Sequence, residues 1–266
     1  MRVVSLHRYA VKSLGGEDLP CSRVEPGGLT GDRRWMVVTP QGRFLTRREV
    51  PAMALVGTVW HSGALDLVHV EAGACRIAEP DHDDYRAARV WGDVVMARDA
   101  GDAAADWLTR VLARPVRLVH IDDTRPRRVD PRFGRDGDRV GFADGFPLLI
   151  TLVESLDALN ARLADPIAMA RFRPNVVIAG APAFAEDGWT RLRIGAALVR
   201  VVKPCTRCVI TTQDPGSGVV TTPMEPLRTL KTMGRVTPGT REPVFGQNAI
   251  PDAPGTIAVG DAVEVL

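Results

Sequence analysis

The sequence predicts a mainly β fold with a few helices, an α+β arrangement, and two observations carry this prediction. Short apolar segments with extended spacing recur along the chain, and turn residues such as Pro40-Gln41-Gly42 separate them. Only two segments repeat apolar residues at the period of an α-helix. Many strands with few helices indicate β-barrels or β-sandwiches decorated by helices.

The first half of the chain has mainly β patterning. We expect strands at residues 1–9, 35–38 and 91–98, and a hairpin within residues 54–70 that turns at Ser62-Gly63. A helix follows, with Asp102 as its N-cap, because apolar residues recur at i, i+3, i+4, i+7 and i+8, namely Ala104, Trp107, Leu108, Val111 and Leu112. Residues 116–121 then return to extended spacing.

A loop dense in arginine, aspartate, proline and glycine at residues 122–138 separates the two halves. We place the domain junction there, which gives domains at residues 1–121 and 122–266. Beyond it we expect a helix that ends before Pro166 and a polar loop at residues 241–252. The expected strands of this half lie at residues 147–153, 176–178, 192–202, 209–212 and within 255–265.

The composition indicates a globular protein without a membrane span or a nucleic-acid partner. Hydrophobic residues make up 45% of the chain, enough for a packed core, and no stretch of about 20 apolar residues occurs. A net charge of +2 is too small for the concentrated basic face of a nucleic-acid binder. The N-terminus lacks the apolar run of a signal peptide, so we expect a cytoplasmic protein. Four cysteines are too few for a disulfide scaffold, and reduced thiols are expected.

Cys205 and Cys208 form the sharpest chemical feature, a C-x-x-C pair with several interpretations. Structural zinc needs four ligands, and the five histidines are scattered in the other half of the chain. A redox pair of the thioredoxin type opens a helix, whereas the flanking residues here have strand patterning. A single thiolate bound to a soft transition metal is the third interpretation, with Lys203 and Arg207 favouring the thiolate. Two buried structural cysteines are the fourth.

An ordered set of motifs covers nearly the whole chain. In the first half these are YAVKSLGG at residues 9–16, GLTGDRRWMVV at 28–38 and FLTRRE at 44–49. In the second half they are FRPNVVI at 172–178, FAEDGW at 184–189, KPCTRC at 203–208, TTQDP at 211–215 and FGQN at 245–248. This set resembles the MOSC proteins, specifically the branch of the mitochondrial amidoxime-reducing component and YcbX. The resemblance implies an N-terminal MOSC-type β-barrel domain packed on a C-terminal MOSC β-barrel domain.

The resemblance also implies a molybdenum–molybdopterin cofactor and the residues that hold it. Cys208 matches the metal ligand of the family. The cofactor contacts implied from the first half are Lys12, Ser13 and Arg33, and those implied from the second half are Arg173, Asn175, Thr206, Arg207 and Asn248. The chemistry of these residues agrees, because cations suit the phosphate of the pterin and amides suit its ring edge. The interpretation requires Lys12 and Arg33 to meet Arg173 and Cys208 around one cleft.

The activity implied by the resemblance is reduction of N-hydroxylated compounds such as amidoximes and N-hydroxylated bases. Asp214, six residues after Cys208, is a candidate catalytic proton donor or orienting residue, and an Asp-Pro turn is the alternative interpretation, which the sequence slightly favours. Electrons are expected from a separate ferredoxin- or cytochrome-like protein, because the chain carries no further cysteine cluster. The alternative is a non-catalytic cofactor carrier or sulfur-transfer module. We expect no pyridoxal-phosphate desulfurase domain, which excludes a full cofactor sulfurase.

Overall fold

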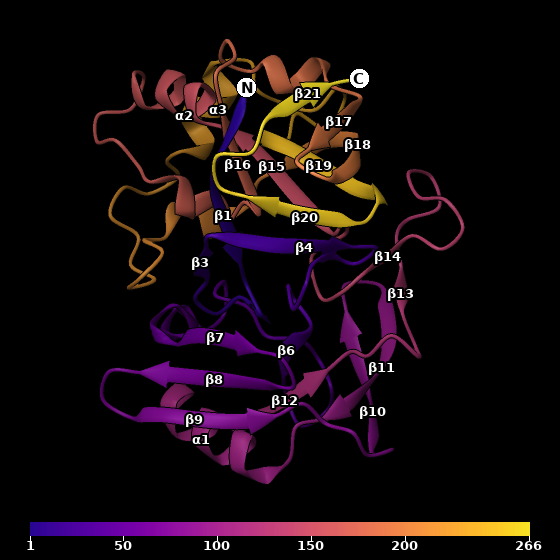
Figure 1. Ribbon diagram of the computed structural model, residues 1–266. Coiled ribbons are helices and arrows are strands. Elements are labelled where there is room, and N and C mark those ends of the chain that lie inside the picture. Colours follow the sequence, from indigo (N-terminus) through magenta and orange to yellow (C-terminus); the bar gives the residue numbers. More distant parts are fainter.

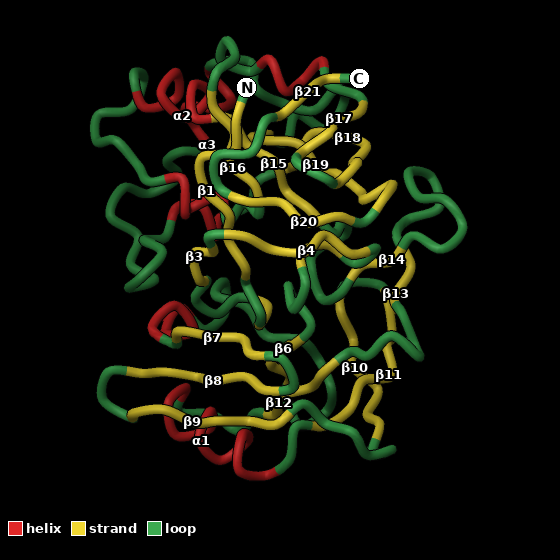
Figure 2. The backbone as a smooth tube through the Cα atoms, in the orientation of Figure 1, coloured by secondary structure: helices red, strands yellow, loops and turns green.

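The computed structural model describes residues 1–266 and confirms the mainly β fold, with 21 strands and three α-helices. Figure 1 shows an upper lobe built mostly from C-terminal strands and a lower lobe built from residues coloured indigo to magenta. Figure 2 shows α1 at the lower end of the molecule and α2 and α3 at the upper end, with the strands between them. The strands lie in open sheets with free edges, so the expectation of closed barrels is corrected to open sheets.

The upper lobe is organised around an eight-stranded sheet. Its strands are, in sheet order, β21 (Val263–Val265), β17 (Arg191–Ile194), β18 (Ala197–Thr206), β19 (Val244–Ala253), β15 (Leu148–Leu152), β16 (Val176–Ala179), β1 (Arg2–Arg8) and β3 (Glu17–Leu19). Neighbours are antiparallel except β15 and β16, which are parallel and are connected through α2 (Val153–Asn160). Every residue of β15 is buried, as expected for a strand covered on both faces.

The lower lobe contains two smaller sheets. The five-stranded sheet has the order β10 (Tyr85–Val90), β11 (Asp93–Asp99), β12 (Arg117–His120), β6 (Trp35–Val38) and β2 (Val11–Lys12). The three-stranded sheet is formed by β7 (Gly57–His61), β8 (Ala64–His69) and β9 (Gly73–Ala78), which includes the predicted hairpin. Helix α1 (Asp102–Leu112) closes the lobe by burying Trp107, Leu108 and Leu112 against Trp35 and Leu65.

Strands from the start of the chain pair with strands from its second half. Although β1 begins the chain, it pairs with β16 of the upper sheet, and β4 (Cys21–Glu25) pairs with both β5 (Gly28–Leu29) and β20 (Gly255–Ala258). The chain therefore passes from the upper lobe to the lower lobe and back. The expected junction contains β13 (Arg127–Arg128) and β14 (Arg139–Val140), and the division at residues 121 and 122 stays a prediction.

Several sequence-based expectations differ from the observed elements near the cysteine pair. Residues 209–212 form a short 3-10 helix, Val209–Thr212, and the prediction of a strand there is wrong. The hydroxyls of Thr211 and Thr212 donate to the carbonyls of Cys208 and Val209, and such local bonds compete with a strand ladder. Residues 241–252 were expected to be a loop, but β19 runs through them and pairs with β15 and β18.

The helix boundaries are close to those expected, with one wrong detail. The N-cap of α1 is Gly101, with φ of 86°, and Asp102 is the first helical residue instead of the cap. Its carboxylate accepts a hydrogen bond from Arg117 at 3.0 Å. The third helix, α3 (Leu227–Thr232), was not expected from the sequence. None of the helices has the length and apolar character that a membrane crossing requires.

The aromatic pair Phe172 and Phe245 tests the packing of the upper lobe. Both side chains are fully buried, and their rings stack with centroids 4.0 Å apart. Phe245→Ala should lower the free energy of unfolding by about 3–5 kcal/mol, because the substitution removes the apolar contact and leaves a cavity. Urea denaturation measures the change. Val70→Ala, at a side chain that is 98% exposed, should change it by no more than about 0.5 kcal/mol, and an equal effect of both substitutions would contradict the packing described.

His120 tests the pH dependence of the lower lobe. Burial lowers the pKa of His120 to about 3, while the unfolded chain protonates it near 6.5, so only the unfolded state takes up this proton between these values. The wild type should therefore lose stability on acidification, by about 2 kcal/mol between pH 6.5 and 4.5. In His120→Phe this loss should disappear, because phenylalanine keeps the ring against Trp35 without a titrating group. Denaturation at both pH values measures it, and identical losses in the two proteins would refute the assignment.

Candidate functional site

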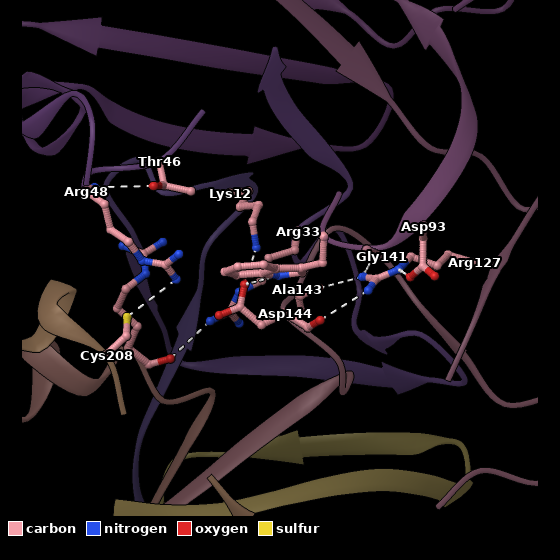
Figure 3. A network of polar contacts seen from close by, with 12 residues as sticks. Lys12, Arg33, Thr46, Arg48, Asp93, Arg127, Gly141, Ala143, Asp144 and Cys208 are labelled. Atoms are coloured by element: carbon pink, nitrogen blue, oxygen red, sulfur yellow. Dashed lines mark hydrogen bonds and ion pairs between the residues drawn. The ribbon is translucent and has the colours of Figure 1, made fainter. Parts of the chain in front are cut away.

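A cleft lies between the two lobes and is lined by residues that are far apart in the sequence. Its polar lining residues are Lys12, Ser13, Arg33, Thr46, Arg48, Asp144, Arg171, Arg173, Asn175, Cys205, Arg207, Cys208, Thr211 and Asn248. The requirement set by the sequence is therefore met, since Lys12 and Arg33 face the same space as Arg173 and Cys208. Figure 3 shows Lys12, Arg33 and Arg48 reaching the cleft from one side and Cys208 from the other.

The cleft has a large excess of positive charge. Six cationic side chains line it, and Asp144 is the only carboxylate among the lining residues. The Nε atom of Arg207 is buried and has no hydrogen-bond partner, although its Nη1 and Nη2 atoms are bonded. Buried donors without partners are costly, and excess cations attract anions. The lining therefore suits an anionic ligand with several acceptor oxygens.

Arg173 is the clearest case of a buried cation whose charge its contacts do not neutralise. Its Nη1 donates to the carbonyl of Leu14 at 2.7 Å, and its guanidinium lies 4.1 Å from the centre of the Tyr9 ring. Burial, followed by the charge of Arg47, lowers the pKa of Arg173 to about 9, so the side chain remains cationic at neutral pH. A bound anion would relieve this cost.

Backbone strain concentrates at the same place. Ser13, Arg33 and Arg173 adopt φ values of 66°, 46° and 54°, in the left-handed region that residues with a Cβ atom seldom occupy. Such residues persist where the surrounding contacts hold them, and they cluster at functional sites. Arg33 supplies such contacts, since it donates to Asn175 Oδ1 at 3.0 Å and to the carbonyl of Arg173 at 3.1 Å.

Lys12 and Asp144 form an ion pair at the opening of the cleft, and Trp91 Nε1 donates to the same Asp144 oxygen at 3.1 Å. Burial lowers the pKa of Lys12, against the opposing effect of Asp144. Burial also raises the pKa of the Asp144 carboxyl, but the charge of Lys12 and its hydrogen bond outweigh burial and hold that pKa below its usual range. Asp144 is therefore ionised and bonds both Trp91 and Lys12; Figure 3 shows the contact with Lys12.

The two cysteines differ in their surroundings. Cys205 lies near the end of β18, and its sulfur accepts a hydrogen bond from Arg207 Nη1 at 2.8 Å. Cys208 immediately precedes the 3-10 helix, and Arg48 Nη2 lies 3.6 Å from its sulfur (Figure 3). No group of three or more His, Cys, Asp or Glu side chains is placed to hold a metal. The soft donors that this lining offers are the two cysteine sulfurs, each beside an arginine side chain.

Comparison with known proteins identifies the family. The MOSC N-terminal beta barrel domain matches residues 1–115, and the MOSC domain matches residues 137–264. The chain belongs to the MOSC family. Mitochondrial amidoxime-reducing component 1 is 36% identical in Xenopus laevis, over 96% of this chain and 79% of the relative, and 36% identical in Homo sapiens, over 99% and 82%. Human mitochondrial amidoxime reducing component 2 is 32% identical, over 98% of this chain and 82% of the relative.

Two of the residues that the sequence predicts at the site, Thr206 and Asp214, do not line the cleft. Thr206 is an exposed residue at the end of β18, where it pairs with Val244. The Asp214 carboxylate accepts hydrogen bonds from the backbone N–H groups of Gly216 and Ser217 and from the Ser217 hydroxyl. The bonds from Ser217 lower the pKa of Asp214. These contacts favour the turn interpretation of Asp214, and both assignments stay predictions.

Sequence reasoning missed three charged residues of the MOSC cleft, namely Arg48, Asp144 and Arg171. Arg48 lies within one of the recognised motifs, at residues 44–49, and its neighbour Arg47 is buried with bonds to the carbonyls of Ser13 and Pro215. The sequence signal for Arg48 was the adjacent pair Arg47-Arg48 in this motif, in which one arginine is buried and the next faces the cleft. Asp144 lies outside every recognised motif, and only the tertiary structure places it beside Lys12.

Anion binding tests the excess charge of the cleft. Inorganic phosphate should raise the melting temperature of the protein by about 3 °C at a concentration ten times its Kd, because it binds the folded state alone. Sodium chloride at equal ionic strength should not reproduce the rise. Arg173→Gln should abolish the effect of phosphate, while Arg241→Gln should keep it, since Arg241 has the same φ of 54° but lies exposed outside the cleft. A phosphate effect that survives in Arg173→Gln would contradict this account.

Proposed function

We propose that this chain binds a molybdenum–molybdopterin cofactor in the cleft and reduces N-hydroxylated compounds such as amidoximes. The observation that carries the proposal is a pair of cysteine sulfurs, Cys205 and Cys208, in a cleft with six cationic side chains, and we assign Cys208 as the metal ligand. The relatives that cover nearly the whole chain are named amidoxime-reducing components, which supports the same activity. A soft sulfur ligand suits molybdenum, and the cations suit the phosphate of the pterin.

The residues present fit this group. Lys12, Arg173 and Arg207 would hold the phosphate, and the partnerless Nε of Arg207 gives it a donor that protein contacts leave free. Asn248 uses its amide nitrogen on the Pro204 carbonyl at 3.4 Å and has its oxygen available for the pterin edge. Asn175 accepts from Arg33 and from the Leu149 N–H, so it would act by holding Arg33 in place. Ser13 would contribute from the other wall of the cleft.

The reaction consumes two electrons and two protons for each N–O bond that breaks, and it releases the oxygen as water. The cofactor supplies the two-electron reduction when it is bound. The chain contributes Cys208 as the ligand of the metal and Arg48 as a hydrogen-bond donor beside that sulfur. Lys12 and Asp144 hold the lining in place through their ion pair.

The electrons would come from a separate ferredoxin- or cytochrome-like donor protein, and the place of action would be the cytoplasm. A carrier or sulfur-transfer module is the alternative function. An open cavity that adjoins Cys208 favours turnover over storage of the cofactor, because a carrier gains nothing from access of small molecules to the metal ligand.

Substitution of the two cysteines tests the metal ligand. Cys208→Ser should lose most of the bound molybdenum and lower benzamidoxime reduction by about a hundredfold or more, because an oxygen ligand replaces the soft thiolate. Cys205→Ser should retain the molybdenum, since the other thiol makes the proposed bond. Elemental analysis after expression in a cofactor-competent host and an assay with supplied electrons measure both effects. Activity of Cys208→Ser equal to that of the wild type would remove the assignment.

A further inference from the structure

Three large apolar side chains stand exposed around Cys208. Trp91, Val209 and Met224 are 41%, 46% and 47% exposed, and all three line one cavity together with the cysteine. They come from three distant segments of the chain. An exposed apolar cluster that borders a polar cleft indicates a binding site for a small molecule.

Trp91 is held rigidly in this cavity. Its backbone has a φ of 53°, and its Nε1 donates to Asp144. The Phe44 ring packs against it with centroids 5.0 Å apart. A large side chain that is fixed on several sides and still exposed gives a ligand a preformed wall, so binding need not order it.

Arg48 connects this wall to the sulfur of Cys208. Its guanidinium carbon lies 4.7 Å from the centre of the Trp91 ring, while its Nη2 lies 3.6 Å from the sulfur of Cys208. Arg48 forms no ion pair with a carboxylate. It therefore has N–H donors available for an oxygen atom of a ligand placed next to Cys208.

The charges of the cavity exclude one class of ligand. Arg48, Arg207 and Lys231 line it, against Glu242 as the only acidic lining residue. A cationic ligand would meet net repulsion, whereas an uncharged or anionic molecule with an acceptor oxygen would not. The apolar side chains favour a molecule whose remaining part is flat and apolar.

We propose that this cavity is the substrate subsite, which rests on the proposed function. It takes an uncharged N-hydroxylated compound with a flat apolar group. That group lies against Val209, Met224 and Trp91, and the oxygen of its N–O bond faces Arg48 and Cys208. The subsite and the cofactor cleft share Arg48, Arg207 and Cys208, which places the bond to be reduced beside the metal ligand.

Two substrates of different apolar size test the subsite. The molybdenum-loaded holoprotein is assayed with reduced methyl viologen as electron source and with benzamidoxime or acetamidoxime as substrate, which carry a phenyl or a methyl group. Val209→Thr, Met224→Gln and the double variant should raise the KM for benzamidoxime roughly threefold to tenfold, because polar atoms replace apolar contact area. The KM for acetamidoxime should change less than about twofold. Val259→Thr, at an equally exposed valine outside the cavity, should leave both values unchanged.

A binding measurement separates the subsite from the activity. Benzamide has no N–O bond, so its Kd for the oxidised holoprotein, measured by calorimetry, reports on the apolar wall alone. The Kd should rise in the double variant and stay constant in Val259→Thr. Equal changes of KM for both amidoximes, or an unchanged Kd for benzamide, would overturn the subsite. A wild type that reduces neither amidoxime would instead refute the proposed function, and the benzamide result would still decide the subsite.

Discussion

The burial of arginine side chains between two lobes is the constraint on which the other features of this protein depend. A guanidinium group taken out of water must replace its lost hydrogen bonds, and here backbone carbonyls do so. Arg173 donates to Leu14, Arg33 donates to Arg173, and Arg207 donates to the carbonyl of Phe172. Two of these three bonds join residues of different halves, so Arg33 and Arg173 gain them only when the two halves pack together.

The strand topology fixes the lobes so that these bonds can form. Strand β1 starts the chain in the upper sheet beside β16, and β4 pairs with β20 near the C-terminus. The segment between them carries Lys12 and Ser13, which are thereby placed opposite the cysteine pair. A pair of lobes joined by one flexible linker would leave the width of the cleft undetermined. Sheets that combine strands from both halves of the chain hold it at one value, as the proposed cofactor site requires.

The cleft separates two chemical environments around one sulfur atom. On the side of Lys12, Arg173 and Arg207 the lining is cationic and suits phosphate and ring-edge contacts. On the side of Val209 and Met224 it is apolar and open. Cys208 lies at the boundary, and Arg48 spans it by contacting both the sulfur and the Trp91 ring. Arg48, which was not among the residues predicted from the sequence, therefore joins the two environments.

The sequence by itself determined the family, the mainly β class and most of the cleft residues, because ordered motifs and short-range periodicity are properties of the chain alone. It identified Lys12, Arg33, Arg173 and Cys208 through these motifs. Only the tertiary structure decided that residues 244–253 form a largely buried strand, because they pair with β15 and β18 on either side and Gln247 bonds to the distant Asp187. It also placed Asp144 beside Lys12, across 132 positions of sequence. Contacts of that range depend on the path of the whole chain, which local spacing does not encode.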